Sequence, residues 1–392
     1  TWVADDIVVF LGSVTYRREG DRLAPVEGSD LGEYRSGRVD PNVIDPPSHA
    51  GDDVVVIART DVAAKIHRPV RMTSLAIRPG RGGENDQGLE YRFIGLLGSA
   101  AYRESVFAIP DVGRRATEVL ERVGAVSESH TGRAVRNVVE TLPRDIVVEL
   151  GVADLTELVS DIVGLQERRI VRVFDVAEPV GPWTTVFVFV PRSRFTATLP
   201  DRVAALVGEF YRGDTRDLET LVGTSSLARI SMTVRGAAPA ELDRLGALVD
   251  EESTTWDERA RDALIDALGE VEGAEVFNAV RGRVPGDYQA RVRPSASVGD
   301  LAHVAELLDG KGSGAPSTPA ILTSFGRSID AIEGEWRFRV FLRDRPAVIA
   351  ELVPVLEYLG LRAIDEHPAQ FGNDHCQVYL HDIGVDVGDV AF

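Results

Sequence analysis

The clearest candidate for ligand binding is a turn between a predicted strand at 336–342 and a predicted helix that ends at Gly360. Backbone N–H groups at the start of a helix carry partial positive charge, so a turn beside them can bind a carboxylate. Proline suits the first helical position, because its missing N–H has no partner there. We therefore predict an effector-binding site of four residues: Asp344, Arg345, Pro346 and Ala347.

A second polar group lies where the predicted N-terminal sheet gives way to helices. The run 99–105 and the tripeptide 67–69 each combine several polar side-chain types, which suits a small anionic ligand. The more ordinary alternative is a helix cap with a hydrogen-bonded turn between sheet and helix. The candidates for this ligand site or interdomain turn are His67, Arg68, Tyr102, Arg103 and Glu104.

The common motifs of nucleotide binding and nucleophilic catalysis are absent from the sequence. No Gly-x-Gly-x-x-Gly follows a strand and opens a helix, and no P-loop motif occurs. The glycine-rich run 310–314 follows a predicted helix and leads into a proline-rich stretch, so we interpret it as a flexible joint. The segment 223–227 lacks the last glycine of a nucleophile elbow. We expect no catalytic and no cofactor-binding residue in this chain.

Histidine and cysteine gather near the C-terminus without the geometry of a metal site. His375, Cys376 and His381 fall in a predicted strand, where successive side chains point to opposite faces. The two histidines then share one face and Cys376 points to the other, so four converging ligands are not in view. We predict strand residues with a partly buried thiol, and no metal site.

Arginine replaces lysine almost completely in this chain. Of its 43 basic residues two are lysine, Lys65 and Lys311. Schiff-base catalysis, phosphate binding by a P-loop lysine and polarisation of a substrate carbonyl by lysines all need this residue type. They must therefore use these two positions or occur outside the chain.

Residue periodicity places the candidates in an α+β protein of several small antiparallel-sheet domains joined by helical connectors. The first part alternates short β-rich runs with turns, and helices follow from 111 to 169. A β-β-α-β-β order over 170–234 is close to a ferredoxin-like sandwich. The first strands are predicted at 6–11, 54–58, 72–77 and 91–97.

The C-terminal module has a β-α-β-β pattern that is one strand short of such a sandwich. The stretch 320–325 is the candidate for the missing edge strand. We expect the helix to start at Pro346 and to pack its apolar face on the sheet. The apolar residues at helical spacing are Val348, Ile349, Leu352, Val355, Leu356 and Leu359.

Composition narrows the class of protein and its partners. The 392 residues exceed what one core usually serves, and 44% hydrophobic residues are typical of globular domains. The formal charge of −19 argues against nucleic acid or an anionic membrane as the main partner. No apolar run is long enough to span a bilayer.

A single cysteine predicts the reducing cytoplasm as the compartment. The start at Thr1, without methionine, suggests a piece of a longer protein.

Several strings, in order along the chain, resemble one enzyme family. The string RVFLRDRPAVIAELVPVLEYLGLRAIDEHP is similar to an ACT regulatory domain. A longer series looks like the N-terminal half of the large bacterial NAD-dependent glutamate dehydrogenases: FLGSVTYRREG, KIHRPVRMTSLAI, FIGLLGSAAYRESVFAIP, SHTGRAVRNVVETLPRD, LQERRIVRVF, VFVPRSRF and VYLHDIG.

The resemblance implies the domain organisation and a missing catalytic part. A PAS-like domain is expected at 1–115, a helical connector at 116–169 and an ACT-like domain at 170–270. A helical segment with a linker at 271–319 then precedes a second ACT-like domain at 320–392. The family's catalytic domain, which binds NAD and converts glutamate to 2-oxoglutarate, is expected outside this chain, so the chain alone is expected to be inactive.

Two roles for the ACT-like domains remain open. ACT domains that bind amino acids generally place glycine after the turn proline, whereas this chain has Ala347, whose methyl group restricts the approach of a ligand. The chain is therefore expected either to sense an amino acid effector or to fix the homo-oligomer of the enzyme. The alternative hypothesis is a standalone amino-acid-binding or scaffold protein that uses the same domains for self-association.

Overall fold

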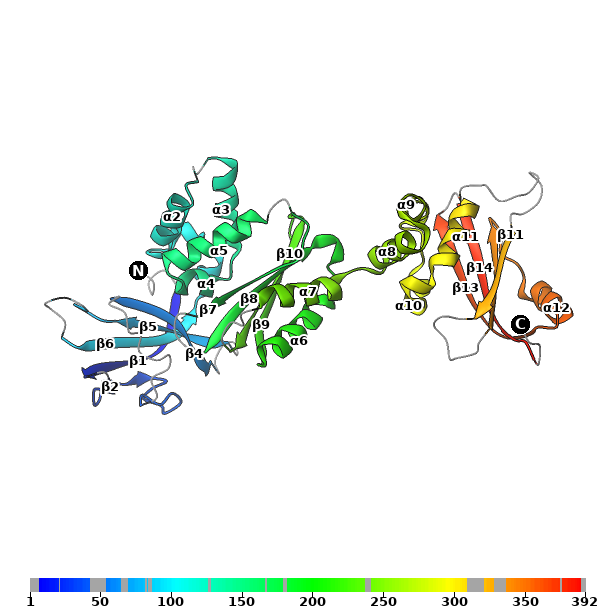
Figure 1. The fold of residues 1–392 in the computed structure, drawn as a ribbon. Coiled ribbons are helices and arrows are strands. Elements are labelled where there is room, and N and C mark those ends of the chain that lie inside the picture. Colours follow the sequence, from blue (N-terminus) through cyan, green and yellow to red (C-terminus); the bar gives the residue numbers. More distant parts are fainter. Residues whose placement is uncertain are drawn as a thin grey trace. The chain divides into compact units, whose positions relative to one another are not determined.

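The protein is described by a computed structural model (Figure 1), in which two compact units, Thr1–Ser253 and Thr254–Phe392, are treated separately. The described residues form three antiparallel sheets and 12 α-helices, so the predicted α+β class is confirmed. No helix among them is long and apolar enough to cross a membrane. The structure describes residues 7–20, 22–42, 54–64, 70–81, 83, 87–125, 128–165, 168–178, 182–236, 241–308, 321–327, 336–373 and 376–388.

The first sheet has the strand order β2-β1-β6-β5-β4, with the short β3 paired to β1. The four predicted strands all lie within this antiparallel sheet, and the PAS-like assignment of the region stays a prediction. The strands are β1 (Val8–Glu19), β2 (Arg22–Pro25), β3 (Leu31–Gly32), β4 (Val55–Ala63), β5 (Arg71–Ile77) and β6 (Leu89–Leu97).

Five helices follow the first sheet, as predicted, and their apolar sides are buried in one core with Ile57 of β4. The last of these helices was predicted to reach Arg169 but ends at Gly164. Glycine weakens a helix, and the Leu165 N–H bonds to the Ile162 carbonyl in a tighter final turn. The helices are α1 (Ser99–Arg103), α2 (Val112–Arg122), α3 (His130–Thr141), α4 (Arg144–Glu149) and α5 (Val152–Gly164), with a 3-10 turn at Val106–Ala108.

The second sheet has the order β7-β8-β10-β9 and the predicted β-β-α-β-β sequence of elements, followed by α7. This is the β-α-β-β-α-β sequence of a ferredoxin-like fold with its last strand moved to the front. The elements are β7 (Arg172–Ala177), β8 (Trp183–Pro191), α6 (Leu199–Tyr211), β9 (Thr215–Leu221), β10 (Leu227–Arg235) and α7 (Leu242–Ser253), with a 3-10 turn at Arg192–Arg194.

Strand β8 is buried over its whole length because both faces of the second sheet are covered. Val186, Val188 and Val190 pack in a core with α6 and α7. Phe187 and Phe189 point to the other face and belong to the core of helices α2–α5. A continuous apolar run, rather than an alternating one, is the pattern of a strand between two apolar layers.

The second unit carries a sheet with the same topology, β11-β12-β14-β13. Strand β11 pairs with β12 and supplies the edge predicted for 320–325. The strands are β11 (Ile321–Arg327), β12 (Trp336–Arg343), β13 (Arg362–Asn373) and β14 (Cys376–Asp386). The helices are α8 (Trp256–Leu268), α9 (Glu270–Val280), α10 (Gly286–Arg291), α11 (Val298–Leu308) and α12 (Ile349–Tyr358), with a 3-10 turn at Pro294–Ala296.

One detail predicted for α12 is wrong. The helix begins at Ile349 rather than at Pro346, because the Ala347 N–H is bonded to the side chain of His381 and 346–348 stays outside the helix. The helix packs on the sheet as predicted, through Leu356 and the half-buried Leu352 against Ile383 and Val385. The opposite sheet face, with Phe341, is packed against α8–α11.

Because β8 is buried on both faces, replacing one of its large side chains with alanine is expected to cause a large loss of stability. Phe187→Ala is expected to reduce the free energy of unfolding of the first unit by about 3–5 kcal/mol, because it leaves a cavity between the second sheet and α2–α5. Urea denaturation of the chain measures this loss. Val271→Ala, on an exposed position of α9, is the control and should change stability by less than about 0.5 kcal/mol. Equal stability of the two variants would contradict the role given to β8.

Candidate functional site

The predicted effector turn lies between β12 and α12, and its start is fixed to strand β14. Asp344 has a left-handed backbone with φ of 61°, which aspartate tolerates better than most residues. Its N–H donates to the Gln377 carbonyl at 2.8 Å, and its carboxylate accepts from the Gln377 N–H at 3.4 Å. Asp344, Arg345 and Pro346 are exposed, and Ala347 is half-buried. Solvent therefore reaches the turn.

The N–H group best placed for an anion at this turn already has a partner. The Ala347 N–H donates to Nε2 of His381 at 3.1 Å, so this nitrogen must be the unprotonated one. The proton on Nδ1 then faces Oε1 of Glu366 at 2.6 Å. A carboxylate that binds the Ala347 N–H must displace the imidazole.

Sequence reasoning missed the role of His381, which it weighed only as a metal ligand. The register could have indicated it, since His381 pairs with Val340 of β12 and with Pro368 of β13. This places the histidine in the central strand pair of the sheet, beside the turn, with 7% of its surface exposed.

The second predicted group does not converge on a cavity in the part that the structure describes. Tyr102, Arg103 and Glu104 lie at the end of α1 with exposed side chains. An arginine of another helix holds their backbone: Arg144 of α4 donates to the Glu104 carbonyl at 2.9 Å. The other two candidates, His67 and Arg68, lie outside the described residues, as do Lys65, Lys311, His375 and the glycine-rich joint. The ligand role of this group stays a prediction.

The described residues contain no cluster of three or more histidine, cysteine or acidic side chains with the spacing of a metal site. Cys376 is a half-buried free thiol at the start of β14. Its N–H donates to Oδ1 of Asn373 at 3.3 Å across the β13–β14 turn.

A buried group of four charges joins the first sheet, α4 and the second sheet. Arg59 of β4 lies 3.1 Å from Oε1 of Glu149 and 2.8 Å from Oε1 of Glu178. Arg71 of β5 also pairs with Glu178, and Arg59 donates to Oγ1 of Thr185 at 3.3 Å. Each guanidinium is paired with a buried glutamate, so we interpret this group as a structural network that fixes three layers.

Three family models match successive parts of the chain, and all three describe glutamate dehydrogenase. Residues 109–168 match helical motif 1, which contains α2–α5. Residues 172–257 match the ACT2 domain and 321–391 match the ACT3 domain. The two four-stranded sheets are therefore ferredoxin-like ACT domains, and the predicted resemblance is confirmed.

Curated relatives extend the match to nearly the whole chain. The NAD-specific glutamate dehydrogenase of Halomonas elongata is 28% identical over 404 residues, which covers 98% of this chain and 24% of the relative. That of Pseudomonas aeruginosa is 27% identical over 399 residues, with 97% and 24% covered. That of Mycobacterium tuberculosis is 25% identical over 383 residues, with 94% and 22% covered.

The chain belongs to the glutamate dehydrogenase family and is similar to the N-terminal, ACT-bearing region of its large NAD-specific members. It spans about a quarter of the length of the curated relatives that it matches.

The buried charge network predicts a pH dependence of stability. Complete burial raises the pKa of Glu149 to about 8, although Arg59 acts in the opposite direction. Between the unfolded value near 4.5 and this raised value, the folded chain retains a proton that the unfolded chain has lost. The stability of the first unit is therefore greatest at the acidic end of this window and falls, on the order of 1 kcal/mol per pH unit, as the pH rises.

Glu149→Gln removes this titration and should flatten the decline, as measured by urea denaturation across that pH window. Glu157→Gln, at an exposed position of α5, serves as the matched control and should keep the wild-type slope. An unchanged slope in Glu149→Gln would show that another group titrates.

Proposed function

We propose that this chain is the regulatory and assembly region of an NAD-dependent glutamate dehydrogenase. The intact enzyme would convert L-glutamate, NAD and water to 2-oxoglutarate, ammonium and NADH. Support comes from the two ACT domains in order with the helical motif, and from the names of the relatives. NAD and the catalytic residues belong to a part of the enzyme outside this chain. The chain by itself is inactive, and the enzyme works in the reducing cytoplasm.

The observation that carries the assembly role is an apolar surface on the second ACT domain. We define the α12 surface as five exposed residues on and beside this helix: Val348, Val355, Tyr358, Leu359 and Ile364. Tyr358 is 93% exposed and Ile364 of β13 is 68% exposed. Large apolar side chains gathered in this way are typical of surfaces that become buried in an assembly.

A sensing role is assigned to the turn of Asp344, Arg345, Pro346 and Ala347. A free amino acid would place its carboxylate on the Ala347 N–H and release His381 toward Glu366. The effector thereby breaks a contact between the turn and the centre of the sheet. It would bind more tightly to the arrangement of the domain in which Ala347 and His381 are apart than to the one in which they are bonded. The methyl group of Ala347 narrows the approach and favours a small effector.

The sensing role predicts that an amino acid changes the rate of glutamate oxidation by the full-length enzyme by about fivefold or more. Asp344→Ala, which removes the side-chain acceptor for the Gln377 N–H and strains the left-handed backbone, should abolish that response while the unstimulated rate stays the same. Asp386→Asn, at an exposed position at the end of β14, is the control. Indifference of the full-length enzyme to every amino acid would exclude sensing, and NADH formation by this chain alone would contradict the proposed division of roles.

The assembly role predicts that the α12 surface controls the oligomeric state. The double variant Tyr358→Ser, Leu359→Ser should convert the oligomer of this chain to a smaller species in size-exclusion chromatography with light scattering. Its thermal midpoint should stay near that of the wild type, because both side chains are exposed. Val271→Ser, 75% exposed on α9, is the control and should keep the wild-type mass. A monomeric wild-type chain would refute assembly through this surface.

A further inference from the structure

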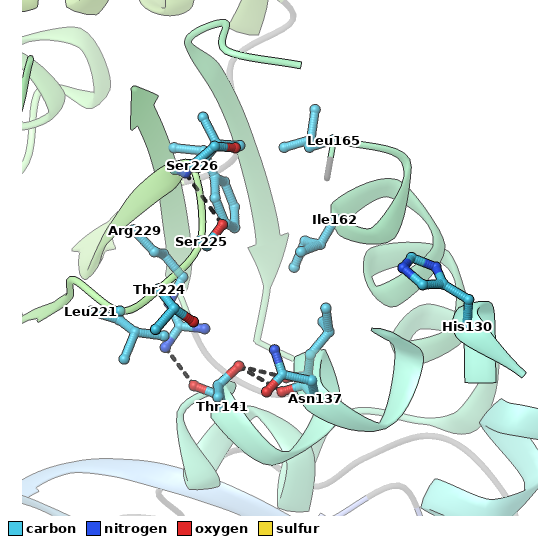
Figure 2. Close-up of a pocket in the computed structure, with 14 residues that line it drawn as sticks. His130, Asn137, Thr141, Ile162, Leu165, Leu221, Thr224, Ser225, Ser226 and Arg229 are labelled. Atoms are coloured by element: carbon cyan, nitrogen blue, oxygen red, sulfur yellow. Dashed lines mark hydrogen bonds between the residues drawn. The ribbon is translucent and has the colours of Figure 1, made fainter. Parts of the chain in front are cut away.

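A cavity of about 510 Å³ lies between the helical motif and the first ACT domain, within the first unit. Figure 2 shows His130, Asn137 and Thr141 of α3 and Ile162 of α5 on one side of it. The turn between β9 and β10 and the first residues of β10 lie opposite. The volume is within the range of small-molecule pockets.

The cavity contains a buried cation that forms no salt bridge with a carboxylate in the described part of the chain. Arg229 of β10 is 8% exposed. Its Nη2 donates to the Thr141 carbonyl at 2.5 Å, and its Nε has no hydrogen-bond partner among the described residues. No acidic oxygen in that part of the chain is recorded within 4.0 Å of its nitrogens. A buried charge of this kind is costly unless an anion compensates it.

Hydroxyl side chains of the turn between β9 and β10 also line the cavity. Thr224 and Ser225 are exposed there, whereas the Oγ of Ser226 is buried and lies apart from the guanidinium of Arg229 (Figure 2). The guanidinium is therefore the group in this cavity that matches the two oxygens of a carboxylate.

Burial also affects the arginine itself. It lowers the pKa of Arg229 to about 10, with Glu219 of β9 acting in the opposite direction. The guanidinium therefore stays charged at neutral pH, at a cost that a bound anion would reduce.

The remaining lining residues indicate the chemical character of the rest of the ligand. Ile162, Leu165 and Phe189 are buried apolar residues that line the cavity, and they suit an apolar body. The 14 lining residues include no aspartate or glutamate, so the cavity offers no acidic side chain to a ligand ammonium group. This argues for an acid without an amino group.

We propose that this cavity binds a small carboxylic acid that has an apolar body and no ammonium group, with Arg229 holding the carboxylate. The site belongs to the first unit, whereas the turn of Asp344 belongs to the second. It therefore goes beyond the proposed function, and its failure leaves the sensing role of that turn untouched.

Titration calorimetry and thermal unfolding of this chain test the proposal with matched probes. The acids are acetate, isocaproate and hydrocinnamate, the uncharged counterparts are isocaproamide and hydrocinnamide, and the amino acids are leucine and phenylalanine. Isocaproate or hydrocinnamate should bind and raise the midpoint of the first unit. The amide and the amino acid of the same shape should bind about tenfold more weakly or not at all.

Substitutions then locate the site. Arg229→Gln should weaken binding of the acid by about tenfold or more. Arg229→Lys, which keeps a charge at this position but loses the two-pronged guanidinium, is expected to weaken it by a smaller factor. Arg235→Gln, at an exposed position at the other end of β10, is the control and should bind as the wild type does.

Three results would overturn the proposal. One is the absence of binding by all three acids to folded wild-type chain. The second is an amide or amino acid that raises the midpoint of the first unit as much as its acid does. The third is unchanged affinity in both Arg229→Gln and Arg229→Lys.

Discussion

The first unit depends on a single constraint, which is the burial of strand β8 on both of its faces. Because valines alternate with phenylalanines along it, one strand contributes to two cores at once. The ACT sheet can therefore not separate from the helical motif without exposing Phe187 and Phe189 to water. The backbone hydrogen bonds of β8 are satisfied by β7 and β10, so nothing polar interrupts this arrangement.

Buried arginines lie toward both ends of the strand pair β8–β10, and their partners differ. Near the start of β8, Thr185 meets the network in which Arg59 and Arg71 pair with two glutamates. Toward the other end Arg229, paired in register with Phe189, donates to a backbone carbonyl and forms no salt bridge among the described residues. A network of paired side chains stabilises an interface, whereas a buried cation without a salt bridge is a feature expected of a ligand site.

The sequence predicted the elements better than the contacts between them. The apolar run that forms β8 and the stripes of α2–α5 were recognisable, because each pattern records burial directly. The start of α12 was not, since it depends on a hydrogen bond between Ala347 and His381, which are 34 positions apart. Arg229 was missed for the same reason. Among so many arginines, nothing local marks the one whose partner is a carbonyl of α3 rather than a carboxylate.

The two ACT domains share a strand order but use it differently. In the first, α2–α5 cover one face of the sheet and α6 and α7 the other, and the buried Arg229 lies beside a cavity. In the second, α8–α11 cover one face and α12 packs on the other through Leu356, while the α12 surface points to solvent. Our proposals follow this difference: the first copy would bind an acid in its interior, and the second would bind an effector at its turn and assemble through the α12 surface. Side-chain burial, and not strand order, separates these roles.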